Sequence, residues 1–213
     1  MKIQTIQYTV LEKNIPQSGQ HILAHQAEES LVVYQAYNHS IAEFALQNQY
    51  LGGPHFSYSR MSWIKPNFLW MMYRCGWASK ENQERVLAIW LKKTDFETIL
   101  SQAVFSSFKE DKYKDGEDWK TELHSKEVRL QWDPDHDPFG RKLNRRAIQL
   151  GLKGNALEAF GRGCIQSIED ITGFVQEQSA KLNTNRIADL LVPLESVYKP
   201  IDKTLYSKID IAE

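Results

Sequence analysis

Three of the six tryptophans and three cations of this chain lie within residues 60–77, RMSWIKPNFLWMMYRCGW. Aromatic faces stack on planar rings, and guanidinium and ammonium groups hold anions. A nucleotide offers both a planar base and phosphates, so this combination favours a nucleotide or a nucleic-acid strand as ligand. The candidate ligand contacts are therefore Arg60, Trp63, Lys65, Tyr73, Arg74 and Trp77. Arg60 is the first choice for a phosphate contact, because the loop before it, GGPHFSYS with Ser57, can bend around a ligand.

The same segment predicts a buried helix. Pro66 suits the first helical position and Gly76 suits the position just past the end. The residues between them are apolar nearly all round, which is typical of a helix buried on most sides. Most of these aromatic side chains are then core residues, and each cation has a structural alternative as an ion pair or a solvated tip.

Polar side chains also stand in two apolar stretches, LVVYQAY (31–37) and RRAIQLGL (145–152). Strand alternation predicts that Gln35 faces away from Tyr34 and Tyr37. Gln149 needs hydrogen-bond partners in its apolar strand, either from a neighbouring backbone or from a ligand. We include these four residues among the site candidates.

The stretch WDPDHD (132–137) places Asp133, Asp135, His136 and Asp137 close together, a set of metal-ligand types. The spacing differs from that of the twelve-residue calcium loop, and no glutamate closes it. A polar turn begun by Asp-Pro is favoured, and we expect no metal. Cys75 and Cys164 are isolated, which predicts free thiols in a reducing compartment.

Composition sets broad limits on the protein. The chain has 213 residues, of which 42% are hydrophobic and 25% charged, with a formal net charge of −1. These values fit a globular domain without a global field that attracts nucleic acid or an anionic membrane. The N-terminus does not read as a secretory signal, and the longest apolar stretch, FLWMMY, is too short to span a bilayer. We expect a cytoplasmic protein that does not enter a membrane.

Several elements must position the candidate residues. Hydrophobic patterns predict strands at 31–37, 86–91, 128–132, 145–152 and 165–171. Helices are predicted from Asn38 or Ser40 to a stop at Gly52-Gly53, at 95–108, after Gly154, and at 172–182, with polar loops at 109–127 and 133–144. This pattern favours an α+β fold in a single domain, with a central mixed β-sheet and flanking helices. We expect this domain at 27–182, an N-terminal extension at 1–26 and a loosely packed C-terminal extension at 183–213.

The segment RMSWIKPNFLWMMYRCGWASKENQERVLAIWL resembles the signature of a bacterial and fungal family, domain of unknown function family 4291. VVYQAYNHSIAEFAL, VRLQWDPDHD and RRAIQLGL resemble other blocks of that family. The resemblance covers roughly residues 27–182. It implies one domain and no established activity.

A fainter resemblance is to ADP-ribosyltransferases. It rests on the order of LVVYQAY, a helix ending in glycine, HFSYSR, and finally RRAIQLGLKGNALEAF. It implies an ADP-ribosyltransferase-like fold, a cleft for NAD or a related nucleotide, and a catalytic position at Gln149. That family places a histidine or arginine where Gln35 stands and a glutamate where Gln149 stands, so a conventional transferase mechanism lacks its carboxylate here.

These observations leave three functional hypotheses. The first is an ADP-ribosyltransferase-like enzyme that binds NAD or a related nucleotide and transfers its ADP-ribose group to an acceptor. The sequence does not specify this acceptor, and nucleic acid is among the candidates. The second is a non-enzymatic module that binds a nucleotide or stacks single-stranded nucleic acid on the same aromatic residues. The third is an interaction protein whose tryptophans are all core. Both charge signs mix in KEDKYKDGEDW (109–119), which disfavours a nucleic-acid groove.

Overall fold

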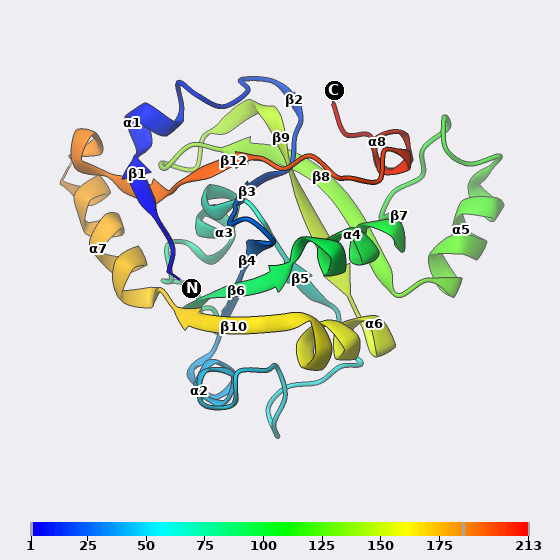
Figure 1. Ribbon diagram of the computed structural model, residues 1–213, viewed down its shortest axis with the longest axis horizontal. Coiled ribbons are helices and arrows are strands. Elements are labelled where there is room, and N and C mark those ends of the chain that lie inside the picture. The colour runs from blue at the N-terminus through cyan, green and yellow to red at the C-terminus, as the bar shows by residue number, and fades with distance from the viewer. Residues whose placement is uncertain (1, 185, 213) are drawn as a thin grey trace.

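The computed structural model describes residues 2–184 and 186–212 (Figure 1). The strands are β1 (Thr5–Gln7), β2 (Gly19–Gln20), β3 (Leu23–His25), β4 (Ser30–Tyr37), β5 (Ser62–Ile64), β6 (Arg85–Lys92), β7 (Ala103–Phe105), β8 (Val128–His136), β9 (Lys142–Leu152), β10 (Ile165–Asp170), β11 (Leu191–Pro193) and β12 (Glu195–Val197). The helices are α1 (Tyr8–Leu11), α2 (His39–Asn48), α3 (Phe68–Cys75), α4 (Lys93–Ser101), α5 (Gly116–Ser125), α6 (Gly154–Ala159), α7 (Thr172–Asn183) and α8 (Thr204–Lys208). The expected α+β fold in a single domain is confirmed.

The main strands form two sheets instead of the one central sheet that we expected. An antiparallel sheet has the order β10-β6-β4, and a larger sheet has the order β2-β9-β8-β7 with β5 paired to β9. The larger sheet is mixed, because β2 runs parallel to β9 and β7 parallel to β8. Figure 1 shows β6 and β10 side by side, while the long strands β8 and β9 run at a steep angle to them, past α4.

The strand β4 is buried on both faces, which explains its continuous apolar sequence. Leu31 and Val33 face one hydrophobic core, which lies towards the larger sheet. Val32 and Tyr34 face a second core, which contains α3. Neighbouring residues of this strand therefore belong to different environments, and a polar residue on it must satisfy its hydrogen bonds within the protein or in a cleft.

The predicted buried helix is confirmed as α3, but it starts two residues after Pro66. The side chain of Asn67 accepts a hydrogen bond from the backbone N–H of Trp70 at 2.7 Å and so caps the helix. Gly76 ends it with a left-handed φ of 58°. Phe68, Trp70 and the other apolar residues of the helix are buried except Tyr73.

Three other boundaries differ from the sequence prediction. The helix α2 is capped by Asn38, one of the two expected candidates, but ends at Asn48, because Gln49 already adopts a left-handed φ of 58°. The predicted helix 95–108 is instead α4 followed by β7. The expected loop 109–127 contains α5, which Asp115 caps by accepting hydrogen bonds from two backbone N–H groups.

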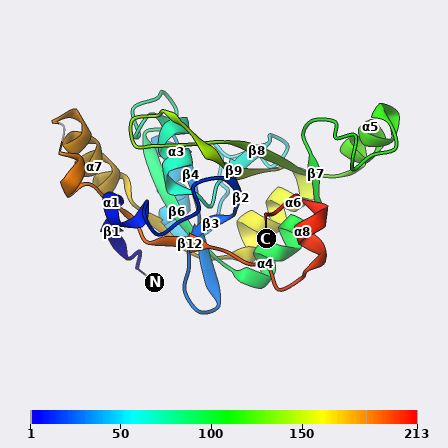
Figure 2. The same ribbon diagram turned by 90° about the horizontal axis from the view of Figure 1, so that it is seen from above.

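The C-terminal segment is packed, so the expectation of a loose extension is wrong. β11 pairs with β1 and β12 pairs with β3, and Tyr198, Leu205 and Ile209 are buried in the core. Few apolar residues suffice here, because most of them pack against the body of the domain, although Ile201 is 79% exposed. Two views show α5 and α7 at opposite ends of the molecule (Figures 1 and 2). No helix in the described part of the chain has the length and apolar character needed to cross a bilayer.

Candidate functional site

A short segment connects the two main sheets. Trp63 in β5 pairs with Gly151 in β9, which belongs to the larger sheet. Two residues later, the backbone of Lys65 donates to and accepts from the backbone of Tyr34 in β4, at 3.2 and 2.7 Å. The chain therefore passes from one sheet to the other within residues 62–65.

A cleft of about 450 Å³ opens where these sheets meet. Strands β4, β5, β8 and β9, helix α3 and the loop before β6 contribute to its wall. Its lining residues are Gln35, Ala36, Tyr37, Met61, Ser62, Trp63, Lys65, Met71, Arg74, Gln83, Gln131 and Gln149. The volume lies within the usual range of small-molecule sites.

Lys65 is a buried cation without a counter-charge. Lys65 is 2% exposed, and its ammonium donates a hydrogen bond to the backbone oxygen of Trp63 at 3.1 Å. Among the described residues, no carboxylate lies within 4.0 Å of it. Burial, together with the positive charge of Arg74, lowers the pKa of Lys65 to about 7. Near neutral pH the amine therefore exchanges between its charged and neutral forms, and an entering anion would favour the charged form.

Two glutamines face each other on the other wall. Gln131 in β8 is the cross-strand partner of Gln149 in β9. Each amide donates one N–H to a different carboxylate oxygen of Asp133, and both distances are 2.8 Å. This shared acceptor fixes both amides and leaves each carbonyl oxygen and one further N–H per side chain for a ligand.

A serine joins the polar residues of β4 to β5. The amide of Gln35 donates to the Ser62 hydroxyl at 2.6 Å, and the hydroxyls of Tyr37 and Ser62 are 2.8 Å apart. Gln35 and Tyr37 therefore share a face, which corrects our prediction that they point apart; residues two apart in a strand lie on the same side. Burial raises the pKa of Tyr37 to about 12, so this phenol stays neutral.

Trp63 lies across the backbone of β9 at a glycine. A Cβ built on Gly151 would lie 2.9 Å from the Trp63 ring and 2.8 Å from the Met61 sulfur. The absence of a side chain at this position lets both residues approach the strand closely. Trp63 thus presents an aromatic surface beside Lys65 in the cleft.

The cleft brings together six of the predicted site residues. These are Gln35, Tyr37, Trp63, Lys65, Arg74 and Gln149. Arg74 is positioned by the last turn of α3, where it is exposed. The proposed neighbourhood of a cation and Gln149 therefore exists, although the cations concerned are Lys65 and Arg74.

The other five candidates lie outside the lining. Tyr34 is fully buried on the opposite face of β4, with its ring edge-on to Phe68. Tyr73 stacks on His136 with ring centroids 3.6 Å apart, and Trp77 donates its indole N–H to the Pro138 carbonyl at 3.2 Å.

Ser57 and Arg60 complete this group. Both are exposed, and the hydroxyl of Ser57 lies 2.9 Å from that of Ser59. Arg60 was our first choice for a phosphate contact. We correct that choice, because Arg60 does not line the cleft, although the next residue, Met61, does.

Sequence reasoning missed six lining residues and one residue behind the wall. The missed lining residues are Ala36, Met61, Ser62, Met71, Gln83 and Gln131, and the residue behind them is Asp133. Gln131 could have been found from the same signal that identified Gln149, because each is an amide side chain within an apolar strand. Ser62 carried no such signal, because its role depends on partners in β4.

The acidic stretch 132–137 is divided among separate structural tasks. Asp133 holds the glutamines, Asp135 pairs with Arg145 at 2.5 Å, and Asp137 accepts backbone hydrogen bonds in the turn between β8 and β9. The stretch itself continues β8 to His136, so the predicted turn begins later than expected. In residues 2–184 and 186–212, no group of three or more His, Cys, Asp or Glu side chains could hold a metal ion. Both cysteines are free.

The fold and cleft together define a single-domain α+β protein with a polar site at the junction of two sheets. The family described as "Domain of unknown function (DUF4291)" matches residues 21–198. The chain therefore belongs to this family, which confirms the first resemblance, and the match extends beyond residues 27–182 at both ends. No curated protein matches the chain.

Proposed function

We propose that the cleft binds a nucleotide, with NAD or a related nucleotide as the leading candidate, within an ADP-ribosyltransferase-like domain. The observation that carries this proposal is the buried, unpaired Lys65 beside Arg74 in a cleft that also presents Trp63. A buried cation without a partner is unfavourable by itself, and a bound phosphate would supply the missing charge.

Each wall of the cleft has a distinct role in this proposal. Arg74 and Lys65 bind phosphate oxygens, and Trp63 stacks on a planar ring. Gln131 and Gln149 hydrogen-bond ribose hydroxyls or base edges, because Asp133 holds their amides in place. Preorganised amides lose little conformational entropy when a ligand binds.

A transfer step would require a group that stabilises positive charge on the ribose. Cleavage of the bond between nicotinamide and ribose develops positive charge on the sugar, and the resemblance places a glutamate at this position. Gln149 carries no charge, so it can orient the ribose but cannot match a carboxylate in stabilising that cation. The lining residues include no carboxylate, and Asp133 lies behind the glutamines.

The shape of the cleft favours a single nucleotide over a nucleic-acid strand. Strand binding uses several aromatic residues on which successive bases stack. Trp63 faces the cleft, whereas Tyr73 stacks on His136 and Trp77 packs edge-on against Phe68. The aromatic residues of 60–77 therefore do not form a continuous track.

Isothermal titration calorimetry with NAD, ADP-ribose, ATP and a short oligonucleotide tests the proposal. We expect a nucleotide to bind, with an affinity that falls as the pH rises through about 7, because the amine of Lys65 then loses its proton. Lys65→Met should remove this pH dependence, and Arg74→Met should weaken binding at every pH.

Arg60→Met is the matched control, since Arg60 is exposed and lies outside the cleft. It should leave the affinity unchanged. The absence of binding by every nucleotide at millimolar concentration would refute the proposal. Tighter binding of the oligonucleotide than of any mononucleotide would favour the strand-binding alternative. A NAD complex that releases no nicotinamide would show that the protein binds the nucleotide but does not transfer its ADP-ribose group.

A further inference from the structure

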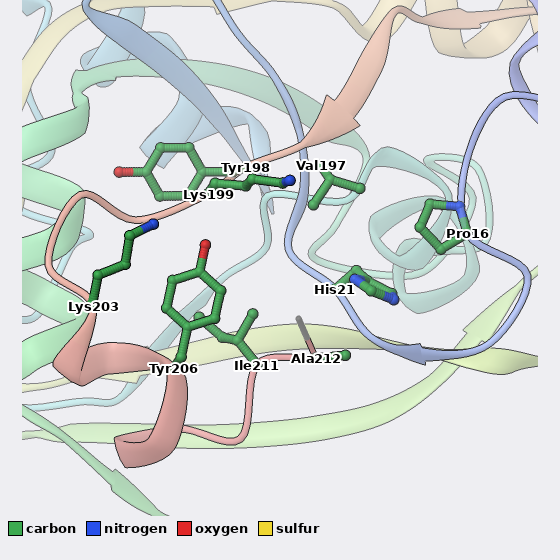
Figure 3. Close-up of a pocket in the computed structure, with 9 residues that line it drawn as sticks. All are labelled: Pro16, His21, Val197, Tyr198, Lys199, Lys203, Tyr206, Ile211 and Ala212. Carbon is green, nitrogen blue, oxygen red and sulfur yellow. The ribbon is translucent and has the colours of Figure 1, made fainter.

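A second cavity, of about 650 Å³, lies near the C-terminal end of the described chain (Figure 3). Three segments that are distant in sequence form its wall: residues 16–21, 197–199 and 203–212. Its lining residues are Pro16, His21, Val197, Tyr198, Lys199, Lys203, Tyr206, Ile211 and Ala212. Figure 3 shows Lys203 and Tyr206 on the side of the cavity opposite to Pro16 and His21.

The charged groups of this cavity share one sign. Its ionisable lining residues are His21, Lys199, Lys203 and the two tyrosines, without an aspartate or glutamate. The Lys203 ammonium lies 5.0 Å from the centre of the Tyr206 ring. Among the described residues, neither Lys199 nor Lys203 lies within ion-pair distance of a carboxylate. A ligand with negative charge would therefore complement this wall.

Three carboxylates on neighbouring elements have partners elsewhere in the protein. Asp210 forms an ion pair with Lys112 at 2.6 Å. Glu97 accepts a hydrogen bond from the Tyr198 hydroxyl at 2.7 Å, and Asp202 accepts one from the backbone N–H of Thr204 at 2.9 Å. Among the described residues, none of these carboxylates forms an ion pair with Lys199 or Lys203, so the two ammonium groups remain available to a ligand.

The rest of the lining is apolar. Pro16, Val197, Ile211 and Ala212 present hydrocarbon surface between the basic groups. A mostly apolar cavity with a few polar groups is the usual form of a site for a small organic molecule, and the volume is in the usual range. Free phosphate or another small inorganic anion would leave this hydrocarbon surface uncovered.

We propose that this cavity binds a small amphipathic carboxylate, such as an aryl or alkyl acid. The carboxylate lies against Lys199 and Lys203, and the apolar body lies against Pro16, Val197 and Ala212. The site is separate from the nucleotide cleft, with which it shares no lining residue. Residues 199–212 also lie beyond the segment 21–198 that matches the family, so this tail of the chain completes the site.

Calorimetric titration with naphthalene-1-acetate and its neutral analogue naphthalene-1-acetamide tests the proposal on the full chain. The two probes share the aromatic body and differ in charge. We expect the acid to bind at least tenfold more tightly than the amide. The double variant Lys199→Gln/Lys203→Gln should reduce the affinity for the acid to that of the amide, and Ala212→Phe should weaken both probes by filling the cavity.

The double variant Lys13→Gln/Lys126→Gln is the matched control, because it removes two exposed lysines that do not line the cavity. It should keep the preference for the acid. Equal affinities of the acid and the amide would overturn the proposal, as would an equal loss in both double variants or no binding at millimolar concentration. Thermal melts of each variant separate lost binding from lost folding.

Discussion

Two buried cations of this protein have opposite surroundings. Arg145 is 1% exposed, and its guanidinium binds both carboxylate oxygens of Glu12 at 2.7 and 3.0 Å and Asp135 at 2.5 Å. Lys65 is 2% exposed and donates to a backbone carbonyl. The fold surrounds the first cation with counter-charges and leaves the second without one.

The two pKa shifts follow from this difference. Burial alone would lower the pKa of Arg145, but the hydrogen bonds that it donates to Glu12 and the charge of Asp135 raise it above its usual range. Burial, together with the positive charge of Arg74, lowers the pKa of Lys65 to about 7, because no carboxylate pairs with it closely enough to offset these effects. Removing a partner of a paired buried cation destabilises the fold, whereas a buried cation that lacks partners is suited to an external anion. The comparison therefore separates a structural site from a candidate binding site.

The largest expected effect is the loss of a partner of Arg145. Asp135→Asn leaves the buried guanidinium with one counter-charge, and we expect the free energy of unfolding to fall by about 3–5 kcal/mol. Urea denaturation at pH 7 measures this. The matched control is Glu158→Gln at the exposed Arg162–Glu158 pair, whose side chains are 55% and 51% exposed, and its loss should stay below about 1 kcal/mol. Similar losses in the two variants would show that the Arg145 network adds no special stability.

Lys65→Met should instead increase the free energy of unfolding. The pKa of Lys65 is about 7 in the folded protein and 10.5 in its ordinary state, so the unfolded chain binds more protons between these values. The stability of the unsubstituted protein therefore rises with pH from about 7 to 10.5, and the penalty from Lys65 is largest below pH 7. We expect the variant to gain roughly 3 kcal/mol at pH 6 and to lose this gain towards pH 10.5. Denaturation at pH 6, 8 and 10 measures it, and a destabilised variant at pH 6 would contradict the comparison.

Glu195 extends the comparison to a buried anion. Glu195 is 5% exposed. Its carboxylate accepts a hydrogen bond from the backbone N–H of Phe68 at 2.7 Å, at the start of α3. Burial raises its pKa from 4.5 to about 8. The stability that this group contributes is complete below pH 4.5 and is lost as the pH rises through 8.

Glu195→Gln should therefore stabilise the protein at pH 9, by roughly 2 kcal/mol, since an amide keeps an acceptor for Phe68 without a charge. The gain should vanish near pH 4.5. Melting temperatures at pH 4.5, 7 and 9 test this prediction. If the variant is less stable than the unsubstituted protein at pH 9, the hydrogen bond to the carboxylate contributes more stability than burial of its charge removes.

The smallest effect is expected at the cleft itself. Gly151→Ala places a methyl group within 2.9 Å of the Trp63 ring and should displace it, which weakens nucleotide binding by about tenfold, or 1.4 kcal/mol. Titration calorimetry and Trp fluorescence report the affinity and the displacement. Gly116→Ala is the control, since a Cβ there has no heavy atom within 4 Å. An unchanged affinity in Gly151→Ala would remove Trp63 from the proposed site.

Local signals in the sequence determined the main elements. The apolar run 31–37 predicted β4, and the apolar circumference after Pro66 predicted a buried α3. Asn38 or Ser40 was expected to cap α2, and Asn38 does so. Side-chain periodicity and capping depend on residues a few positions apart, so a sequence shows them directly.

Part of the candidate site was also visible in the sequence. An amide within an apolar strand identified Gln149, and cations within an aromatic segment identified Lys65 and Arg74. The same reasoning placed Arg60 first, and the structure puts it in solvent outside the cleft. The sequence shows that a cation lies near apolar residues in the chain. It does not show whether the folded chain directs that side chain into the cleft or into solvent.

Only the tertiary structure decided which cation has partners. Arg145 meets Glu12 across 133 positions of sequence, while Lys65 meets no carboxylate among the described residues although Asp133 and Glu195 belong to neighbouring elements. The packing of the N-terminal segment against β9 creates the first environment, and the crossing from β5 to β4 creates the second. The sequence determined the types of these side chains, but burial and charge pairing depend on contacts between distant segments, which form only when the sheets assemble.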